Sequence, residues 1–430
     1  MSDFDVIVVG AGPAGSSAAI KLASSGSNVL LVERADPPGS KAVSGGILWG
    51  KELEKVVPDW EKVTPLERFI EYKSTAFLTE ESKVSVDFRT KKFEKSKTGY
   101  SVLRAKLDQF LAQKAKAAGA TLVTGITVDS LSMKDGIVNG VVQDGETVTA
   151  NTVILAEGTN PRVAIEAGLM KPLSDLDSAI GIKEVVKLSE NTINERFNLK
   201  GNAGYAGEFV LGFLEGGVRA GGFMYTNKDS LSVGVVISLP HLRENGKTYA
   251  YDIMEKFMQH PYVSPLVEGG QVQEYSAHLV SEGGVNSMPD LYGDGYMIAG
   301  DSAGFTFSNG MVIQGMNYAI ASGVLAAETA IEAIKKKEFT RGALSSYQSK
   351  LERSQVLMDL RKFRGIDRLV WSRLVHETAP EMLENILFGI FYEDGSPKKH
   401  LANTILQGIS GSNMKKSELI METYRMLRRM

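Results

Sequence analysis

The sequence predicts an α/β protein with three parts: a domain built on a parallel β-sheet, an inserted domain with an antiparallel sheet, and a helical C-terminal region. Three observations predict this arrangement. A short apolar run near the start leads through a glycine-rich turn into a segment of small residues. Apolar and polar residues alternate between residues 180 and 238, and the pattern is helical from residue 340 onward. A chain of 430 residues is also too long for a single core.

The composition excludes several classes of protein. The net charge is -3, so nothing favours a nucleic-acid partner. The chain has no cysteine, which excludes disulfides, thiol redox chemistry and cysteine-ligated zinc or iron–sulfur sites within it. The 5 histidines are scattered without the spacing of a metal site. We therefore expect no metal centre in this chain.

The first elements form a predicted βαβ unit. Phe4–Val9 is apolar and rich in β-branched residues, as in a strand buried on both faces of a parallel sheet. Pro13–Ser25 reads as a helix of small residues that Gly26 ends, and Asn28–Glu33 is the next strand.

The turn between the first strand and the helix has the glycine spacing of a dinucleotide-binding loop. Gly10 allows the tight turn, Gly12 lets the backbone approach a pyrophosphate, and Gly15 lets the helix pack on the strand. The helix N-terminus offers free N–H groups to the phosphates. Glu33 ends the next strand about 20 residues on, where a ribose-binding acid belongs. A ligand-free turn is the alternative, but the context favours binding by Gly10, Ala11, Gly12, Pro13, Ala14, Gly15 and Glu33.

A second element separates FAD from NAD. Gly300 and Asp301 follow a predicted strand, and Gly310–Asn317 is predicted to open a helix. An acid at a strand end can bind a sugar-alcohol hydroxyl, and a helix N-terminus stabilises negative charge on a reduced flavin ring. Alone, Asp301 reads as a cap or turn residue. Combined with the N-terminal loop, it favours a Rossmann-like FAD-binding domain.

The remaining segments define the domains. Arg104–Ala118 is a predicted helix, and Asp135-Gly136 and Asp144-Gly145 are hairpin turns. Thr152–Ala156 and Tyr296–Ala299 read as further strands of the first sheet. We expect the FAD-binding domain in residues 1–75, 100–165 and 285–340, the substrate domain in 76–99 and 166–284, and the helical region in 341–430.

Several motifs together resemble the glutathione-reductase-type FAD proteins, in the branch with aromatic hydroxylases and geranylgeranyl reductases. They are the N-terminal loop with Glu33, Leu103-Arg104, Ala156-Glu157-Gly158 and Gly300-Asp301. Other strings closely resemble FixC-like members of the electron-transfer-flavoprotein:quinone oxidoreductase family, over most of residues 3–360. They include Val43-Ser44-Gly45-Gly46, Lys183-Glu184-Val185, Gly221–Asn227 and Glu274–His278 followed by Glu282-Gly283-Gly284.

By position, the resemblance implies an FAD site that runs through the first domain. Gly10–Gly15 and Glu33 would bind the ADP part, and Arg34 would flank the adenosine. Asp301 would lie near the ribityl chain. Glu157 stands where the hydroxylases usually have aspartate, which argues against hydroxylation. The other cofactor-binding residues implied are Ser44, Gly45, Gly46, Arg104, Val128, Ala156, Gly158, Gly300, Gly315, Met316 and Asn317.

The resemblance also implies a quinone pocket beside the flavin, lined by Gly221, Gly222, Phe223 and Tyr225. Glycine lets the backbone approach a flat ring, and aromatic side chains stack on it. From spacing alone, a hairpin with core aromatics is an equal alternative.

The functional hypothesis is FAD-dependent electron transfer from an electron-transfer flavoprotein to quinone. The missing cysteines fit a separate, small ferredoxin-like iron–sulfur subunit, with electron bifurcation as a further option. One alternative is a stand-alone geranylgeranyl reductase-like enzyme that reduces isoprenoid double bonds. Another is a flavin-binding scaffold subunit without turnover.

The sequence also carries an expectation about location. No stretch reads as a signal peptide, and none reaches the roughly 20 apolar residues of a membrane-spanning helix. We therefore expect a cytoplasmic protein, with peripheral contact to the inner face of the cell membrane as an option that a terminal helix with arginines allows.

Overall fold

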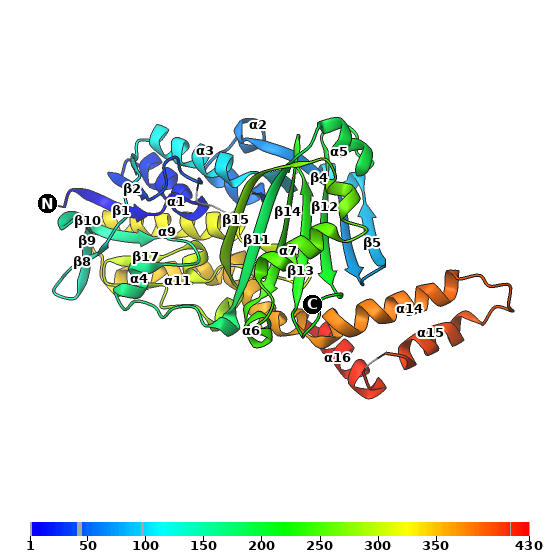
Figure 1. Cartoon of the computed structure of the whole chain (residues 1–430). Helices are drawn as coiled ribbons and strands as arrows, with labels where there is room; N and C mark the ends of the chain where they lie inside the picture. The colour runs from blue at the N-terminus through cyan, green and yellow to red at the C-terminus, as the bar shows by residue number, and fades with distance from the viewer. Residues whose placement is uncertain (1, 41–44, 96–98, 413, 430) are drawn as a thin grey trace.

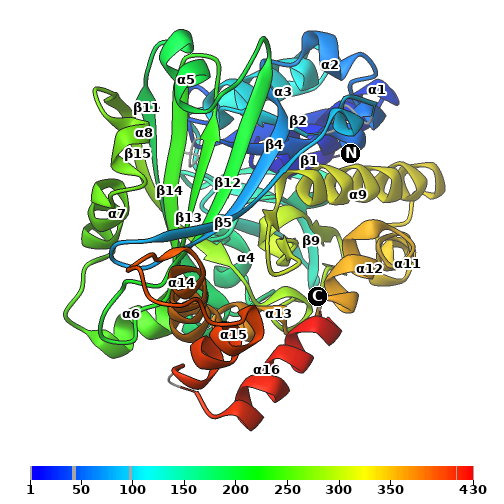
Figure 2. The same ribbon diagram turned by 90° about the vertical axis from the view of Figure 1, so that its right-hand side faces the viewer.

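The computed structural model describes residues 2–40, 45–95, 99–412 and 414–429. Two large sheets form the two halves of the body, and a helical extension projects from one end (Figure 1). Viewed from that end, the strands of the second sheet stand beside the helices of the first domain (Figure 2).

The first sheet holds the glycine-rich loop. Its central strands run parallel, and its order is β16-β17-β10-β1-β2-β7. Two further strands, β8 and β9, continue from β10 as antiparallel hairpins. The bounds are β1 Phe4–Val9, β2 Val29–Glu33, β7 Thr121–Thr124, β8 Ser130–Lys134, β9 Ile137–Gln143, β10 Glu146–Leu155, β16 Tyr292–Gly293 and β17 Tyr296–Ile298.

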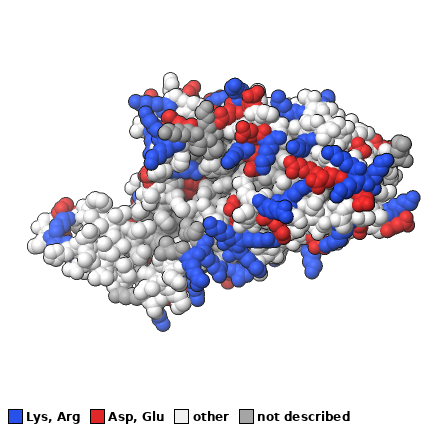
Figure 3. All heavy atoms as spheres, turned by 180° about the vertical axis from the view of Figure 1, so that it is seen from behind, with Lys and Arg blue, Asp and Glu red and all other residues white. Residues whose placement is uncertain are grey.

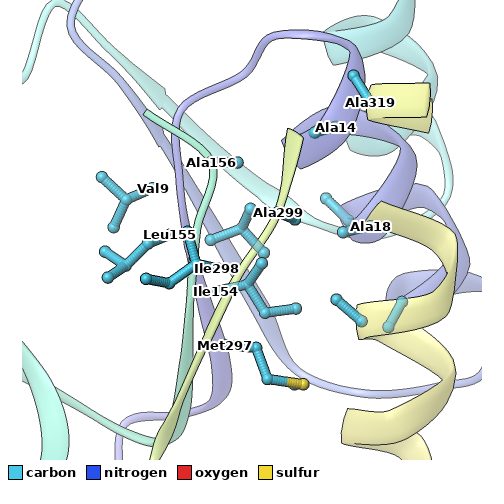
Figure 4. Close-up of a cluster of buried hydrophobic side chains, with 14 of the residues drawn as sticks. Val9, Ala14, Ala18, Ile154, Leu155, Ala156, Met297, Ile298, Ala299 and Ala319 are labelled. Atoms are coloured by element: carbon cyan, nitrogen blue, oxygen red, sulfur yellow. The ribbon is translucent and has the colours of Figure 1, made fainter. Parts of the chain in front are cut away.

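Three helices pack against this sheet: α1 (Pro13–Ser24), α3 (Arg104–Ala117) and α9 (Met316–Lys336). Figure 4 shows small side chains of α1 and α9 against Ile154 and Ile298 of the central strands. The two helices approach closely because their contact residues are small: a Cβ added at Gly323 would lie 2.1 Å from the Ala14 carbonyl oxygen. This packing fixes the N-termini of both helices at the same edge of the sheet.

The second sheet has the order β15-β11-β14-β13-β12-β4-β6-β3, with β5 paired to β4. Its pairs are antiparallel except for β12 with β4, which run parallel. The bounds are β3 Gly46–Trp49, β4 Leu66–Leu78, β5 Lys83–Arg89, β6 Gly99–Val102, β11 Ser178–Lys187, β12 Ala203–Leu211, β13 Ala220–Thr226, β14 Ser230–Ser238 and β15 Gln271–Ser281.

The two faces of the second sheet differ. Leu231, Val233 and Val235 of β14 form one core with Met254 and Phe257 of α7 (Ala250–Gln259). Side chains at the alternate positions point to the other face, as the period of two in a strand requires. That other face meets the first domain and forms the wall of the cavity described below.

The chain after residue 340 is helical, as the sequence predicts. Among the described residues, no helix has both the length and the apolar character needed to span a membrane. The bounds are α10 Arg341–Leu344, α11 Ser346–Glu352, α12 Gln355–Lys362, α13 Ile366–Val370, a π-helix Leu374–Thr378, α14 Ala379–Phe391, α15 Leu401–Ser410 and α16 Lys416–Arg429. Shorter helices elsewhere are α2 Trp60–Val63, α4 Arg162–Glu166, α5 Glu190–Arg196, α6 Leu239–Asn245 and α8 Ser264–Val267.

One predicted element differs from the structure. Gly310–Asn317 does not open a helix directly, because the chain first forms a small hairpin of β18 (Phe307–Ser308) and β19 (Ile313–Gln314). The Asn309 side chain accepts hydrogen bonds from the backbone N–H groups of Met311 and Val312, which stabilises the turn. The helix α9 then begins at Met316.

Candidate functional site

The N-terminal loop has the geometry that its glycines predict. Gly10 adopts φ +100°, and a Cβ at this position would lie 2.3 Å from the Ala156 carbonyl oxygen. A Cβ at Gly15 would lie 1.8 Å from the Gly10 carbonyl oxygen. A Cβ at Gly12, by contrast, would meet only Arg104 Nη2, at 3.9 Å. Gly10 and Gly15 are thus required by the fold, whereas Gly12 borders open space.

Glu33 ties the loop to the end of β2. Its carboxylate accepts hydrogen bonds from the backbone N–H groups of Ala11 and Ala35, both at 2.8 Å. Arg34 follows on the exposed surface. A carboxylate has about four acceptor positions, so Glu33 keeps capacity for a ribose hydroxyl.

A single cavity of about 720 Å³ lies between the loop and the second sheet. Predicted residues that line it are Gly12, Pro13, Ala14, Gly45, Gly46, Arg104, Ala156, Gly158, Gly300, Asp301, Gly315, Met316, Gly221, Gly222, Phe223 and Tyr225. Predicted residues outside its lining are Gly10, Ala11, Gly15, Glu33, Arg34, Val128 and Asn317. Ser44 lies outside the described residues.

Two of the residues outside the lining have structural partners. The Val128 carbonyl accepts a hydrogen bond from Arg162, and Asn317 donates to the Gln314 side chain. Glu157, the residue that differs from the hydroxylases, accepts from the N–H groups of Val163 and Ala164 and so stabilises the start of α4.

Charged groups flank the cavity on the side of the first domain. Arg104 makes a two-point ion pair with Asp108, with both N–O distances at 2.8 Å. Asp301 is close to Gly315, since a Cβ added at Gly315 would lie 3.6 Å from Asp301 Oδ1. That Oδ1 atom is buried and has no hydrogen-bond partner among the described residues. Burial raises the pKa of Asp301, and Arg104 partly offsets this rise.

Lys183 of β11 contacts the residue that precedes β3. Its ammonium group donates to the Gly45 carbonyl oxygen, and its Nζ lies 5.1 Å from the centre of the Phe223 ring. Burial, reinforced by nearby Arg104, lowers the pKa of Lys183 to about 7. The Phe223 ring stacks on Tyr225 at a centroid distance of 5.2 Å.

The far end of the cavity is formed by the C-terminal region. Trp371, Val375, His376 and Met426 line it there. Trp371 donates to Glu282 Oε2 at 2.6 Å and stacks on His376. Arg219 holds this end by donating to the Trp371 carbonyl and to Glu377. One continuous space therefore runs from the glycine loop to the base of the C-terminal helices.

Two family models match successive parts of the chain. Residues 4–185 match the model described as pyridine nucleotide-disulphide oxidoreductase. Residues 178–280 match the model described as ETF-QO, ubiquinone-binding.

Whole-length relatives identify the family. Protein FixC of Escherichia coli K12 is 41% identical over 405 residues, which is 94% of each chain. The chain belongs to the FixC family of electron-transfer-flavoprotein:quinone oxidoreductases. A protein of Escherichia coli K12 named as a probable electron transfer flavoprotein-quinone oxidoreductase, YdiS, is 39% identical to this FixC-family chain, over 94% of it and 95% of YdiS.

Solved structures share the fold of the FixC-family chain. A geranylgeranyl bacteriochlorophyll reductase-like protein from Thermoplasma acidophilum superposes with a TM-score of 0.70 at 21% identity, covering 98% of this chain and 99% of the other. A flavin-dependent brominase, Bmp2, has a TM-score of 0.62, covering 99% and 93%. The predicted α/β fold, with an FAD-binding domain and an inserted sheet, is confirmed, and the chain is an FAD-dependent oxidoreductase.

The residues of the FixC-family chain fit FAD. The buried, unpartnered oxygen of Asp301 requires a donor such as a sugar-alcohol hydroxyl. The open space beside Gly12 leaves room for a pyrophosphate next to the backbone. The N-terminus of α9, a helix of 21 residues, lies at the same cavity through Gly315 and Met316.

The lining side chains that sequence reasoning missed include Trp49, Lys183 and Glu208. Lys183 belongs to the Lys183-Glu184-Val185 string, which supported the resemblance but received no functional role. Glu208 carried a usable signal, because it is the one charged residue of β12, a strand that is otherwise apolar or aromatic. Trp49 gave no such signal.

Proposed function

We propose that this chain passes electrons from an electron-transfer flavoprotein through its FAD to a quinone. One observation carries the proposal: a single cavity joins the FAD cradle to the aromatic wall of the second sheet. Gly221 and Gly222 add no side chains to that wall, and Phe223 and Tyr225 provide ring faces. A flat quinone ring next to the flavin suits such a wall.

FAD, when bound, supplies the one- and two-electron chemistry that no side chain provides. The N-terminus of α1 and Arg104 would hold the pyrophosphate. Asp301 would accept a hydrogen bond from the ribityl chain. The N-terminus of α9 and the Lys183 ammonium would favour negative charge on the ring.

A separate iron–sulfur subunit is the further part of the proposal. The chain has no cysteine, so it cannot ligate a cluster through thiolates. A small ferredoxin-like partner would supply the cluster, and low-potential electrons could then be split off to a ferredoxin. Copurification of this chain with a cysteine-rich subunit that shows cluster absorbance supports this part. A pure, active complex without iron contradicts it.

The proposed function is tested by steady-state turnover of the purified complex. We expect bound FAD, its bleaching by reduced electron-transfer flavoprotein, and reduction of a short-chain quinone in equal electron amounts. A complex with bound FAD that passes no electrons to the quinone would contradict the proposal.

The rival function is reduction of isoprenoid double bonds by this chain alone. The likeness to the Thermoplasma protein concerns the fold only. Incubation of the isolated chain with a prenyl lipid and a reductant separates the two functions, because the rival requires saturation of the lipid and our proposal requires none.

Membrane contact is the remaining part of the proposal, and the extension of α14 and α15 supports it. Asn385–Phe391 and Leu401–Ser410 contain no charged residue. Phe388 is 62% exposed, Phe391 77% and Leu406 55%. Exposed apolar groups of this size, gathered in one projecting element, are typical of surfaces that bind a partner or a lipid bilayer.

The charge beside this extension favours lipid over protein. Figure 3 shows the extension almost free of charged groups and a gathering of Lys and Arg beside its base. Anionic headgroups of the inner membrane face would pair with such a patch. The exposed Lys and Arg residues of α12, α13, α16 and the segments between α12 and α14 are Arg361, Lys362, Arg364, Arg368, Arg373, Arg425, Arg428 and Arg429.

A lipid-bound extension would also bring the cavity to the quinone. The π-helix Leu374–Thr378 leads into α14, and its Val375 and His376 line the far end of the cavity. A hydrophobic quinone could therefore enter from the bilayer at the base of the extension and reach the flavin without crossing water.

We expect the double variant F388S/F391S to bind anionic vesicles roughly tenfold less than the wild type, because two exposed aromatic anchors are lost. Vesicle flotation measures this. The matched control is L176S/V272S, which alters residues that are 79% and 55% exposed elsewhere. Equal flotation of wild type and F388S/F391S, or equal wild-type binding to neutral and anionic vesicles, would contradict the proposed contact.

A further inference from the structure

Among the described residues, the strands of the second sheet contribute one carboxylate to the cavity lining, that of Glu208 on β12. It lies directly opposite Phe223 of β13 and opposite Thr75 of β4. Both of these neighbours line the cavity. Directly opposed residues share a face of the sheet, with Cβ atoms about 5 Å apart. Glu208 therefore stands beside the aromatic wall, at the level where Phe223 meets the cavity.

The side chain of Glu208 is half-buried and lines the cavity. Its Oε1 is buried and has no hydrogen-bond partner among the described residues. Burial raises the pKa of Glu208 to about 7, with Lys73 partly offsetting the rise. Glu208 and Lys73 do not form an ion pair. The Nζ atom of Lys73 instead lies 4.3 Å from the centre of the Trp49 ring. An unsatisfied carboxyl that is half protonated near neutral pH is poised to exchange a proton.

Other titratable groups that line the cavity are less suited to exchanging a proton. Tyr225 of β13 lies opposite Ala206, diagonally from Glu208, and burial raises its pKa well above 10, so it is a poor acid. Lys183, on the far side of Phe223, already donates to the Gly45 carbonyl. At the distant end of the cavity, Glu282 is bound to the Trp371 indole.

We propose that Glu208 is the proton donor to a carbonyl oxygen of the bound quinone, an inference that rests on the proposed function. Reduction of a quinone to a quinol takes two electrons and two protons. The electron-transfer flavoprotein supplies the electrons. The Glu208 O–H bond breaks and a quinol O–H bond forms, so the carboxyl is left as carboxylate. Solvent then returns its proton through the cavity, and the second quinol proton also comes from solvent.

The test compares two acceptors in the purified complex. With a short-chain quinone at pH 7, we expect E208Q to turn over roughly 100-fold more slowly than the wild type. With ferricenium, which accepts an electron and no proton, E208Q and wild type should be equal. E208D should recover part of the quinone rate. The matched control is E184Q, which alters a carboxylate on the opposite face of the same sheet.

The pH dependence gives a second readout. The wild-type quinone rate should fall as pH rises above about 7, where Glu208 loses its proton. E208Q should lack the part of this fall that comes from Glu208, whereas the part that comes from Lys183, whose pKa is also about 7, should remain. Equal quinone rates in wild type and E208Q would overturn the role of Glu208 and leave the proposed function intact. No quinone reduction by the wild type would overturn both.

A stability measurement is independent of turnover. Because the folded-state pKa of Glu208, about 7, is above the ordinary glutamate value of 4.5, folded wild type loses stability as pH rises between these values. Glutamine has no such loss. In flavin-free protein, the melting temperature of E208Q minus that of wild type should therefore grow between pH 4.5 and 7 and stay constant above. A difference that is flat over this range would overturn the assignment.

Discussion

Replacement of Gly12 by alanine is expected to weaken FAD binding by roughly 100-fold, which is about 2.7 kcal/mol. An added Cβ would meet only Arg104 Nη2, at 3.9 Å, so the protein itself has room for it. Gly12 also adopts φ -71° and ψ -174°, which alanine tolerates. The methyl group would instead occupy the space where the pyrophosphate approaches the backbone. Titration of the flavin-free protein with FAD, followed by flavin fluorescence, measures the loss.

Two controls separate an effect of G12A on FAD binding from an effect on the stability of the fold. Flavin-free G12A should unfold within about 1 kcal/mol of flavin-free wild type, since only a helix-capping position has changed. The control G342A adds a methyl group to α10, where the nearest atom would be 3.8 Å away, and should leave FAD affinity unchanged. FAD affinity of G12A equal to that of the wild type would show that the loop does not hold the pyrophosphate.

Replacement of Arg68 by methionine is expected to destabilise the protein by about 3–5 kcal/mol. Arg68 of β4 is 1% exposed, and its guanidinium donates to the carbonyl oxygens of Asn227, Ala203 and Lys228 and to the Asn194 side chain. Methionine fills similar volume but leaves these buried acceptors without donors. Urea unfolding of R68M and wild type measures the difference.

Arg89 provides the matched control for Arg68. Like Arg68, it is an arginine whose guanidinium donates to more than one acceptor. Its acceptors are the Glu71 carboxylate and the Asn198 carbonyl oxygen, at an exposed edge of the same sheet. We expect R89M to cost less than about 1 kcal/mol. Equal costs for R68M and R89M would mean that the buried network around Arg68 does not hold the end of the second sheet together.

The first βαβ unit could be predicted almost residue by residue. The βαβ unit has a local pattern, so β1 matches its predicted bounds and α1 ends one residue early. The two Asp-Gly turns also form as predicted, with positive φ at Asp135 and Asp144. Local patterns are informative here because turn chemistry and apolar runs fix these elements without help from distant residues.

The cavity could be predicted only in part. The glycine loop and Asp301 lie on short motifs, and the structure brings Arg104, Gly45 and Gly315 to the same space. The neighbourhood of Glu208 and Lys73 depends on the register of β12 on β4, which no sequence pattern specifies. The exposed apolar surface of the extension was also missed, because its apolar residues resemble those of an ordinary packed helix until the structure leaves them exposed.

The central claim is that a quinone takes electrons directly from the flavin of this chain. It is tested most directly by anaerobic stopped flow: the isolated chain with bound FAD is reduced by light and then mixed with a short-chain quinone. We expect the oxidised flavin absorbance to return in full, with one quinol formed for each FAD. A flavin that stays reduced in the presence of excess quinone would contradict the account.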